Sequence, residues 1–156
     1  MAPTLRTITP VDGSLYVERD YADEKMIAAA LSTAKAAQAA WQKTPLGERA
    51  KICLKAVDAF VAEKAGIAEE ISWQMGRPIA YAAGEVGGFE ERARHMIAIA
   101  ADALADIAIE EKQGFTRFIR RQPLGVVFVI APWNFPYLTA VNAFMPAIMA
   151  GNAVIM

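Results

Sequence analysis

The sequence predicts an α/β fold in which a helical N-terminal region precedes the start of a parallel sheet. All 33 charged side chains (16 basic and 17 acidic) lie at or before Arg121, so residues 122–156 carry none. Within that charge-free part, an apolar run at 125–130, a turn, a helical stretch and a second apolar run at 153–156 follow one another. This order of strand, turn, helix and strand is typical of a βαβ unit with parallel strands.

The composition indicates a folded protein and excludes several functional classes. The chain has 156 residues, of which 55% are hydrophobic and 21% charged, which is far from a disordered composition. A net charge of -1 and a pI near 5.9 give no electrostatic footprint for nucleic acid. One cysteine cannot form an internal disulfide, and residues 1–13 lack the apolar segment of a secretory signal. We therefore expect a cytoplasmic protein without a nucleic-acid partner.

The charge-free residues 122–156 also raise the alternative of a membrane span, which needs about 20 predominantly apolar residues in one helix. Pro132, Pro136 and Pro146 interrupt the stretch, and the backbone groups that they free would lack partners in lipid. Burial inside an α/β protein is the better interpretation, because central parallel strands form continuous apolar runs. We expect no membrane association.

Residues 1–110 predict a short hairpin followed by helices. The hairpin lies within residues 1–22, around a turn from Pro10 to Gly13. Residues 23–110 are predicted to be helical, with helices at 23–41, 45–66, 67–75 and 78–107. Asp23 is the predicted N-cap of the first helix and Thr44 that of the second, and Gly76 is predicted to close the third. Apolar spacing predicts buried faces at Ile27, Ala30, Leu31, Ala34, Ala37 and Trp41, then at Ile52, Val57, Phe60 and Val61.

The fourth helix contains three glycines, and strands follow it. Gly84, Gly87 and Gly88 weaken the helix locally, which predicts either a close packing contact or a break. Residues 115–130 are predicted to hold strands, with 116–121 half-exposed because polar and apolar residues mix there. Residues 131–156 are predicted to form a turn, a helix ending at Ala150 and the start of the next strand.

The turn after the first parallel strand presents one indole and one amide. Trp133 and Asn134 lie between Pro132 and Pro136, which restrict the backbone, at the strand end where parallel sheets bind ligands. An indole offers a flat apolar surface, and a neutral amide can donate to a developing oxyanion. The pair would suit a cofactor wall beside an electrophilic site. On the pattern alone, the alternative in which Trp133 fills the core and Asn134 caps the following helix is favoured.

Two segments carry a resemblance to a known family. Residues 123–136 read PLGVVFVIAPWNFP and residues 146–155 read PAIMAGNAVI. They resemble the aldehyde dehydrogenase superfamily pattern P-x-G-V, P-W-N-(F/Y)-P and P-A-(L/I)-x-x-G-N-x-V, with fitting spacing. The helices at 41–49 and 71–78 resemble the N-terminal helical region of that family. The resemblance implies a Rossmann-like sheet, with residues 1–156 forming the N-terminal part of the cofactor-binding domain.

The resemblance also implies a chemistry and a set of site residues. In the family, a cysteine thiolate attacks an aldehyde, hydride passes to NAD or NADP, and a glutamate activates the water that releases a carboxylic acid. Asn134 matches the catalytic asparagine that stabilises the oxyanion. Together with Asn134, the residues matching the turn that lines the nicotinamide are Ile130, Ala131, Pro132 and Trp133. The strands within 116–129 resemble those used for oligomer contacts, which implies a homo-oligomer.

The chain departs from the family in its length. The catalytic cysteine and the general-base glutamate of the family lie far downstream of Met156. We therefore expect an N-terminal fragment of an NAD(P)-dependent aldehyde dehydrogenase that is inactive alone. The alternative is a short non-catalytic module that docks to full-length subunits.

Other candidate residues have simpler interpretations. Cys53 lies within a predicted helix without a nearby histidine, which favours a packing role. His95 has no second ligand at metal spacing, so we expect a partly solvated helix position and no metal site. The glycines at 84–88 do not form a phosphate-binding loop, and the glutamate pairs at 69–70 and 90–91 are interpreted as solvated helix faces.

Overall fold

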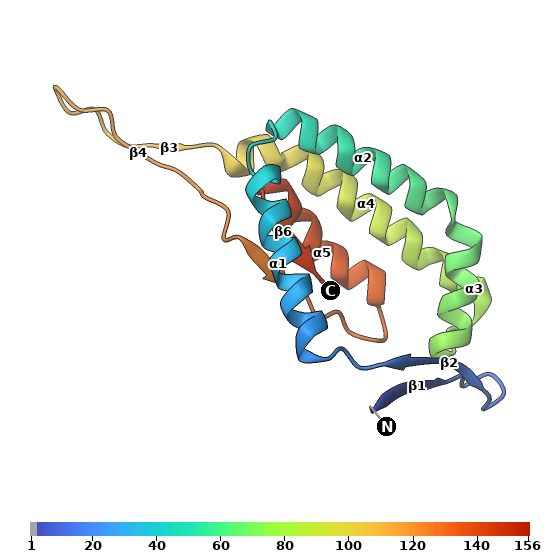
Figure 1. Cartoon of the computed structure of the whole chain (residues 1–156). Helices are drawn as coiled ribbons and strands as arrows, with labels where there is room; N and C mark the ends of the chain where they lie inside the picture. Colours follow the sequence, from blue (N-terminus) through green and yellow to red (C-terminus); the bar gives the residue numbers. More distant parts are fainter. Residues whose placement is uncertain (1–2) are drawn as a thin grey trace.

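The computed structural model describes residues 3–156 and shows a helical body, a hairpin at one end and a thin arm at the other (Figure 1). The parallel unit β5–α5–β6 lies beside the long helices of this body. The elements are β1 (Thr4–Ile8), β2 (Leu15–Asp20), α1 (Glu24–Trp41), α2 (Leu46–Ala62), α3 (Lys64–Met75), α4 (Ile79–Leu104), β3 (Ile107–Ala108), β4 (Phe118–Ile119), β5 (Val126–Phe128), α5 (Pro136–Met149) and β6 (Ala153–Ile155).

The N-terminal hairpin and the first helix cap are confirmed. β1 pairs with β2 in antiparallel register, and Gly13 adopts a φ of 78° in the turn between them. The Asp23 carboxylate accepts a hydrogen bond from the Met26 N–H at 2.7 Å, which satisfies one free donor in the first turn of α1. The hairpin therefore leads directly into a capped helix.

The predicted buried face of α1 is wrong over most of its length. No residue of α1 is fully buried, and Ile27 and Leu31 are each 50% exposed. α1 packs on the two short strands β5 and β6, which offer too little surface to cover a whole helix face. Trp41 and Ala34 are half-buried, so only part of the stripe has a partner.

The main core lies between α2, α4 and α5. Its buried members are Cys53, Val57, Phe89, Ala93, Ile97, Ala100, Val141, Met145 and Met149. The ring centroids of Phe60 and Phe89 are 4.1 Å apart, which joins α2 to α4. Val57 confirms the predicted stripe of α2, whereas Ile52 is 51% exposed because no element within residues 3–156 covers that side of the helix.

Several predicted helix boundaries differ from the structure. α2 ends at Ala62 and α3 begins at Lys64, so the break falls at Glu63 and not at Gly66. Pro45 is the N-cap of α2, one position later than the predicted cap at Thr44. α4 ends at Leu104, and Ile107 belongs to β3 and not to the helix, because it pairs with Ile119 of β4. Gly76 closes α3 with a left-handed φ of 78°, as predicted.

Of the three glycines of α4, only Gly88 lies at a close contact, and none of them breaks the helix. The helix is continuous through Gly84 and Gly88. A Cβ atom at Gly88 would lie 2.5 Å from Leu138 Cδ1, so the missing side chain makes room for the Leu138 side chain in its present position. This contact lies close to the turn that precedes α5.

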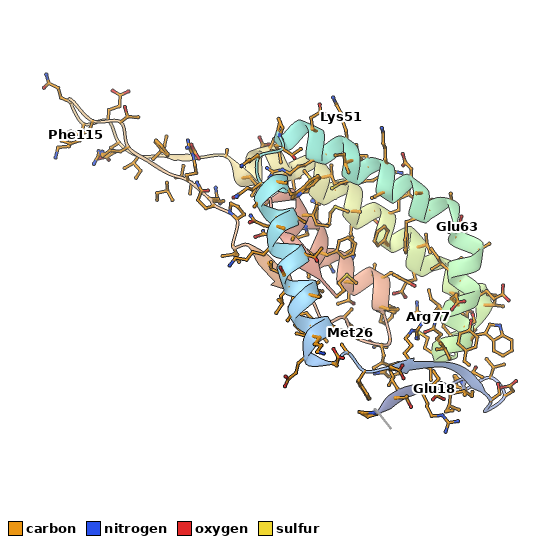
Figure 2. All side chains as sticks on the ribbon, viewed as in Figure 1. Glu18, Met26, Lys51, Glu63, Arg77 and Phe115 are labelled. Atoms are coloured by element: carbon orange, nitrogen blue, oxygen red, sulfur yellow. The ribbon has the colours of Figure 1, made fainter. Side chains whose placement is uncertain are left out.

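Residues 105–121 form an arm that projects from the body (Figure 1). The prediction of a strand over 116–121 holds only for Phe118 and Ile119, which pair with β3, while Lys112 and Phe115 form an isolated bridge farther out. Figure 2 shows Phe115 near the far end of the arm, away from the helices. At the base of the arm, the Arg120 guanidinium donates to both carboxylate oxygens of Asp106.

The parallel β5–α5–β6 unit is confirmed. β5 pairs with β6 from Val126↔Ala153 to Phe128↔Ile155. The ladder continues past β5, because the Val129 N–H donates to the Ile155 carbonyl at 2.9 Å. Among residues 3–156, no helix has both the length and the apolar character needed to cross a membrane.

Candidate functional site

The residues that follow β5 form an exposed turn at the carboxyl ends of β5 and β6. Ile130 is 81% and Trp133 76% exposed, Pro132 and Asn134 are exposed, and Ala131 is half-buried. All five predicted site residues therefore lie together in one turn at the strand ends. Ile130 and Trp133 each leave most of an apolar side chain open near this edge of the parallel unit. Trp133 also lines a cavity with Ile8 and Pro10 of the hairpin region.

Within residues 3–156, neither part of the structural alternative for Trp133 and Asn134 is observed. Trp133 does not belong to the core of this chain, because three quarters of its surface is open. The N-cap of α5 is Phe135, whose side chain makes no capping hydrogen bond, so Asn134 is not the cap of this helix. Within residues 3–156, the Asn134 amide group makes no hydrogen bond at all. Both its donor and its acceptor are therefore free to meet a ligand.

Two residues that the sequence analysis missed hold this turn in place. The Arg77 Nη2 donates to the backbone carbonyl of Asn134 at 2.8 Å, and the Arg77 guanidinium lies 4.3 Å from the centroid of the Phe135 ring. Arg77 also pairs with the carboxylate of Glu85. Figure 2 places Arg77 at the end of the body that faces the β1–β2 hairpin. The turn is thus held through its backbone and not through the asparagine side chain.

Glu85 is the second residue that was missed, and it binds the first turn of α5. Its side chain is fully buried, and one carboxylate oxygen accepts hydrogen bonds from the Tyr137 N–H at 3.0 Å and the Leu138 N–H at 3.2 Å. A negative charge at a helix N-terminus is favourable because the free N–H groups point toward it. A signal existed in the sequence, since Glu85 lies in the buried stripe of α4 with Ala82, Val86 and Phe89.

The opposite end of α5 is fixed by a second asparagine. Asn152 is 5% exposed. Its side-chain oxygen accepts from the Gly125 N–H at 2.9 Å, and its amide nitrogen donates to the Ala147 carbonyl at 2.9 Å. The Trp41 indole N–H also donates to the Ile148 carbonyl at 2.9 Å. These bonds set the start of β5 beside the start of β6 and tie α1 to the end of α5.

Three other groups contribute no chemistry to the turn. Cys53 is buried among α2, α4 and α5, which confirms its packing role, and burial raises the pKa of its thiol. Burial, with the nearby charges of Glu70 and Glu85, also raises the pKa of the Tyr137 phenol, which therefore stays neutral. His95 is exposed on α4. Among residues 3–156, no three histidine, cysteine, aspartate or glutamate side chains gather in a way that could hold a metal ion.

The chain therefore has an α/β fold, and the exposed Asn134 amide lies close to the carboxyl ends of its two parallel strands. Comparisons with known proteins assign this fold to a family. The family model described as "Aldehyde dehydrogenase family" matches residues 2–156. The chain belongs to the aldehyde dehydrogenase family.

Individual relatives agree with this assignment. The chain is 31% identical to a 3,6-anhydro-alpha-L-galactose dehydrogenase of Streptomyces coelicolor, covering 98% of this chain and 31% of the relative. The solved structure of PnpE in complex with nicotinamide adenine dinucleotide has a TM-score of 0.89 at 31% identity, covering 97% of this chain and 31% of PnpE.

A second solved structure has a different cofactor bound. The NADP-dependent glyceraldehyde-3-phosphate dehydrogenase of Bacillus halodurans, complexed with NADP, has a TM-score of 0.87 at 27% identity, covering 97% of this chain and 33% of that enzyme. The present chain thus spans about a third of the length of the relatives that it matches.

Proposed function

We propose that this chain forms the N-terminal part of the cofactor-binding domain of an NAD(P)-dependent aldehyde dehydrogenase, which oxidises an aldehyde to a carboxylic acid. The observation that carries the proposal is the Asn134 amide, which is exposed, makes no hydrogen bond within the described chain, and lies at the carboxyl end of a parallel strand. The family membership and the similarity to dehydrogenases that bind NAD or NADP support the same reaction class.

The role proposed for Asn134 is to donate a hydrogen bond from its neutral amide to an oxyanion. A tetrahedral oxyanion forms when a nucleophile adds to an aldehyde carbonyl, and a preorganised neutral donor stabilises that charge without taking up a proton. The Asn134 amide is such a donor, because its backbone carbonyl is held by Arg77 while its side chain stays free. Loss of one donor of this kind typically lowers the rate by about 10² to 10³.

The residues that would hold NAD or NADP are Ile130, Ala131, Pro132, Trp133 and Asn134. When bound, the nicotinamide supplies the hydride acceptor of the reaction. Ile130 and Trp133 offer apolar surface against which a flat ring can lie, and the short turn between β5 and α5 keeps that surface at the strand ends. The fit rests on position and shape and is the same for either cofactor.

The arm of residues 105–121 is the part of the chain that we assign to subunit contacts. Ile107, Phe115, Phe118 and Ile119 each expose more than 40% of their surface there. Exposed strand edges of this kind pair readily with a second chain, and a homo-oligomer satisfies both the edges and the apolar side chains. The single buried thiol is consistent with a reducing compartment, and we place the protein in the cytoplasm.

The experiment that tests the proposal is the intact mass of the native protein combined with an assay of NADH and NADPH formation over a panel of aliphatic, aromatic and semialdehyde substrates. We expect a mass well above 16.9 kDa and aldehyde-dependent reduction of one cofactor. A native mass of 16.9 kDa without aldehyde-dependent reduction would contradict the proposal and favour a non-catalytic module that docks to longer subunits.

A further inference from the structure

We infer that Arg77 and Glu85 act as positioning residues that aim the Asn134 amide, an inference that rests on the role proposed for Asn134. The pair, called here the turn clamp, touches the turn and the helix after it at four positions. These are the Asn134 carbonyl, the Phe135 ring and the backbone N–H groups of Tyr137 and Leu138.

The burial of Glu85 shows that this contact is specific. The Glu85 side chain has 0% and the Arg77 side chain 14% of its surface exposed. An ion pair removed from water is costly unless further hydrogen bonds satisfy both partners. The remaining partners of Glu85 are the first free N–H groups of α5. The buried charge is therefore stabilised by the start of the helix that Asn134 precedes.

Arg77 connects the buried carboxylate to the turn itself. One guanidinium nitrogen pairs with Glu85 and another donates to the Asn134 carbonyl at 2.8 Å. The planar guanidinium presents its donors in a fixed geometry, so the position of Glu85 determines the position of the Asn134 backbone. The Phe135 ring against the same guanidinium limits rotation of the turn.

The orientation of the Asn134 side chain depends on this backbone contact. The amide has no hydrogen-bonding partner of its own among residues 3–156, so the backbone sets the direction of the Cα–Cβ bond and with it the positions that the amide can reach. Arg77 immediately precedes α4 and Glu85 lies on it, and α4 also contacts Leu138 through Gly88. The clamp thus connects α4 to the backbone of Asn134, the residue that would face the oxyanion.

The test uses a variant of the native enzyme that leaves no buried charge unpaired. The double substitution Arg77→Met with Glu85→Gln removes both charges and keeps an acceptor for the first turn of α5. We expect the single-turnover rate of NAD(P)H formation to fall about tenfold, since displacement of a catalytic group by about 1 Å can cost up to 10² in rate. Arg92→Met, which removes an exposed arginine from α4, is the matched control and should leave the rate unchanged.

A double-mutant cycle separates positioning from general destabilisation. In the Asn134→Ala background the clamp variant should lower the rate less than about twofold, because there is no amide left to aim. The same tenfold loss in both backgrounds, or no loss in either, would overturn the inference. If the double variant does not fold, Arg77→Lys keeps the charge opposite Glu85 and should show a smaller loss with the same dependence on Asn134.

Crystal structures decide the inference independently of the proposed activity. In Arg77→Lys, or in the clamp variant, we expect residues 133–135 to be displaced or to occupy several conformations while α4 and α5 stay in place. An unchanged turn would overturn the positioning role even in an active enzyme. If the wild-type protein reduces no cofactor with any aldehyde, the proposed function fails, and the position of the turn in these structures still decides whether the clamp holds Asn134.

Discussion

Asn134 and Asn152 are the same residue type at opposite ends of α5, and the structure treats them in opposite ways. Asn152 is buried, and it uses its side-chain oxygen and nitrogen to bond Gly125 and Ala147. Asn134 is exposed, and its amide group bonds nothing in the described chain, while Arg77 binds its backbone. An amide is available for chemistry only where the fold does not need it for its own hydrogen bonds.

The difference extends to the surroundings of the two residues. Near Asn152, the side chains of two α1 residues donate to backbone carbonyls: Trp41 to Ile148 and Gln38 to Gly151. These side chains hold α1 against the end of α5 and the segment that joins it to β6. Near Asn134, Arg77 and Glu85 form hydrogen bonds with backbone groups and leave the asparagine side chain exposed. At one end of α5 the asparagine side chain is bonded within the fold, and at the other end only the asparagine backbone is.

The largest expected effect comes from Asn134→Ala. If the amide donates to an oxyanion, the substitution should lower the turnover rate of the native enzyme by about 10² to 10³. The melting temperature should stay within the error of the measurement, because no hydrogen bond within residues 3–156 is lost. Steady-state kinetics and thermal unfolding of the same preparation check both statements. A large loss of stability would show that the Asn134 side chain stabilises the fold, as that of Asn152 does.

Asn152→Ala should have the opposite pattern. The substitution leaves the Gly125 N–H without its partner at the start of β5, and one unsatisfied buried group costs about 1 to 3 kcal/mol of unfolding free energy. The rate per folded molecule should change far less than in Asn134→Ala. Chemical denaturation with active-site titration measures both quantities, and a variant as stable as the wild type would contradict the assignment of Asn152 to the framework.

Trp41→Phe sharpens the same distinction with a smaller effect. The phenyl ring retains most of the packing of α1 on the end of α5 but loses the indole hydrogen bond to the Ile148 carbonyl. A single hydrogen bond of this kind contributes about 0.5 to 1.5 kcal/mol to stability. Denaturant unfolding should show a loss within that range, and Trp73→Phe, which removes the indole stacked on Tyr16 in the hairpin region, is a suitable control.

The smallest expected effect concerns the Cys53 thiol and the way in which the free energy of unfolding depends on pH. Burial raises the pKa of the Cys53 thiol in the folded protein above its value in the unfolded chain, so the stability associated with the neutral thiol is fully present below the unfolded pKa and is lost as the pH rises through the folded pKa. Cys53 should therefore resist iodoacetamide at pH 8 in the folded protein and react after denaturation. Peptide mapping by mass spectrometry measures the modification, and rapid labelling in the native state would contradict a packing role.

Local signals in the sequence predicted most of the elements correctly. The turn from Pro10 to Gly13, the Asp23 cap and the Gly76 stop each depend on a few adjacent residues, and each appears in the structure. The parallel β5–α5–β6 unit also followed from the order of its apolar runs. These features are local, so a single sequence contains the information that they need.

The errors arose where a partner element decides the outcome. Ile27 and Leu31 have the correct helical spacing but little to pack against, and residues 116–121 have a strand-like pattern with only a two-residue partner strand. The turn clamp was missed for the same reason, because Arg77 and Glu85 are far from Asn134 in the sequence. A glutamate inside an apolar stripe, as at Glu85, is the one local signal that pointed to such a contact.

The measurement that tests the account most directly is the single-turnover rate of NAD(P)H formation in Asn134→Asp compared with Asn134→Ala. Aspartate has nearly the shape of asparagine, but as a carboxylate it has no donor and repels a negative oxygen. We predict that Asn134→Asp is at least as slow as Asn134→Ala. A rate for Asn134→Asp close to the wild-type value would show that shape and not donation matters at this position, and would contradict the role given to Asn134.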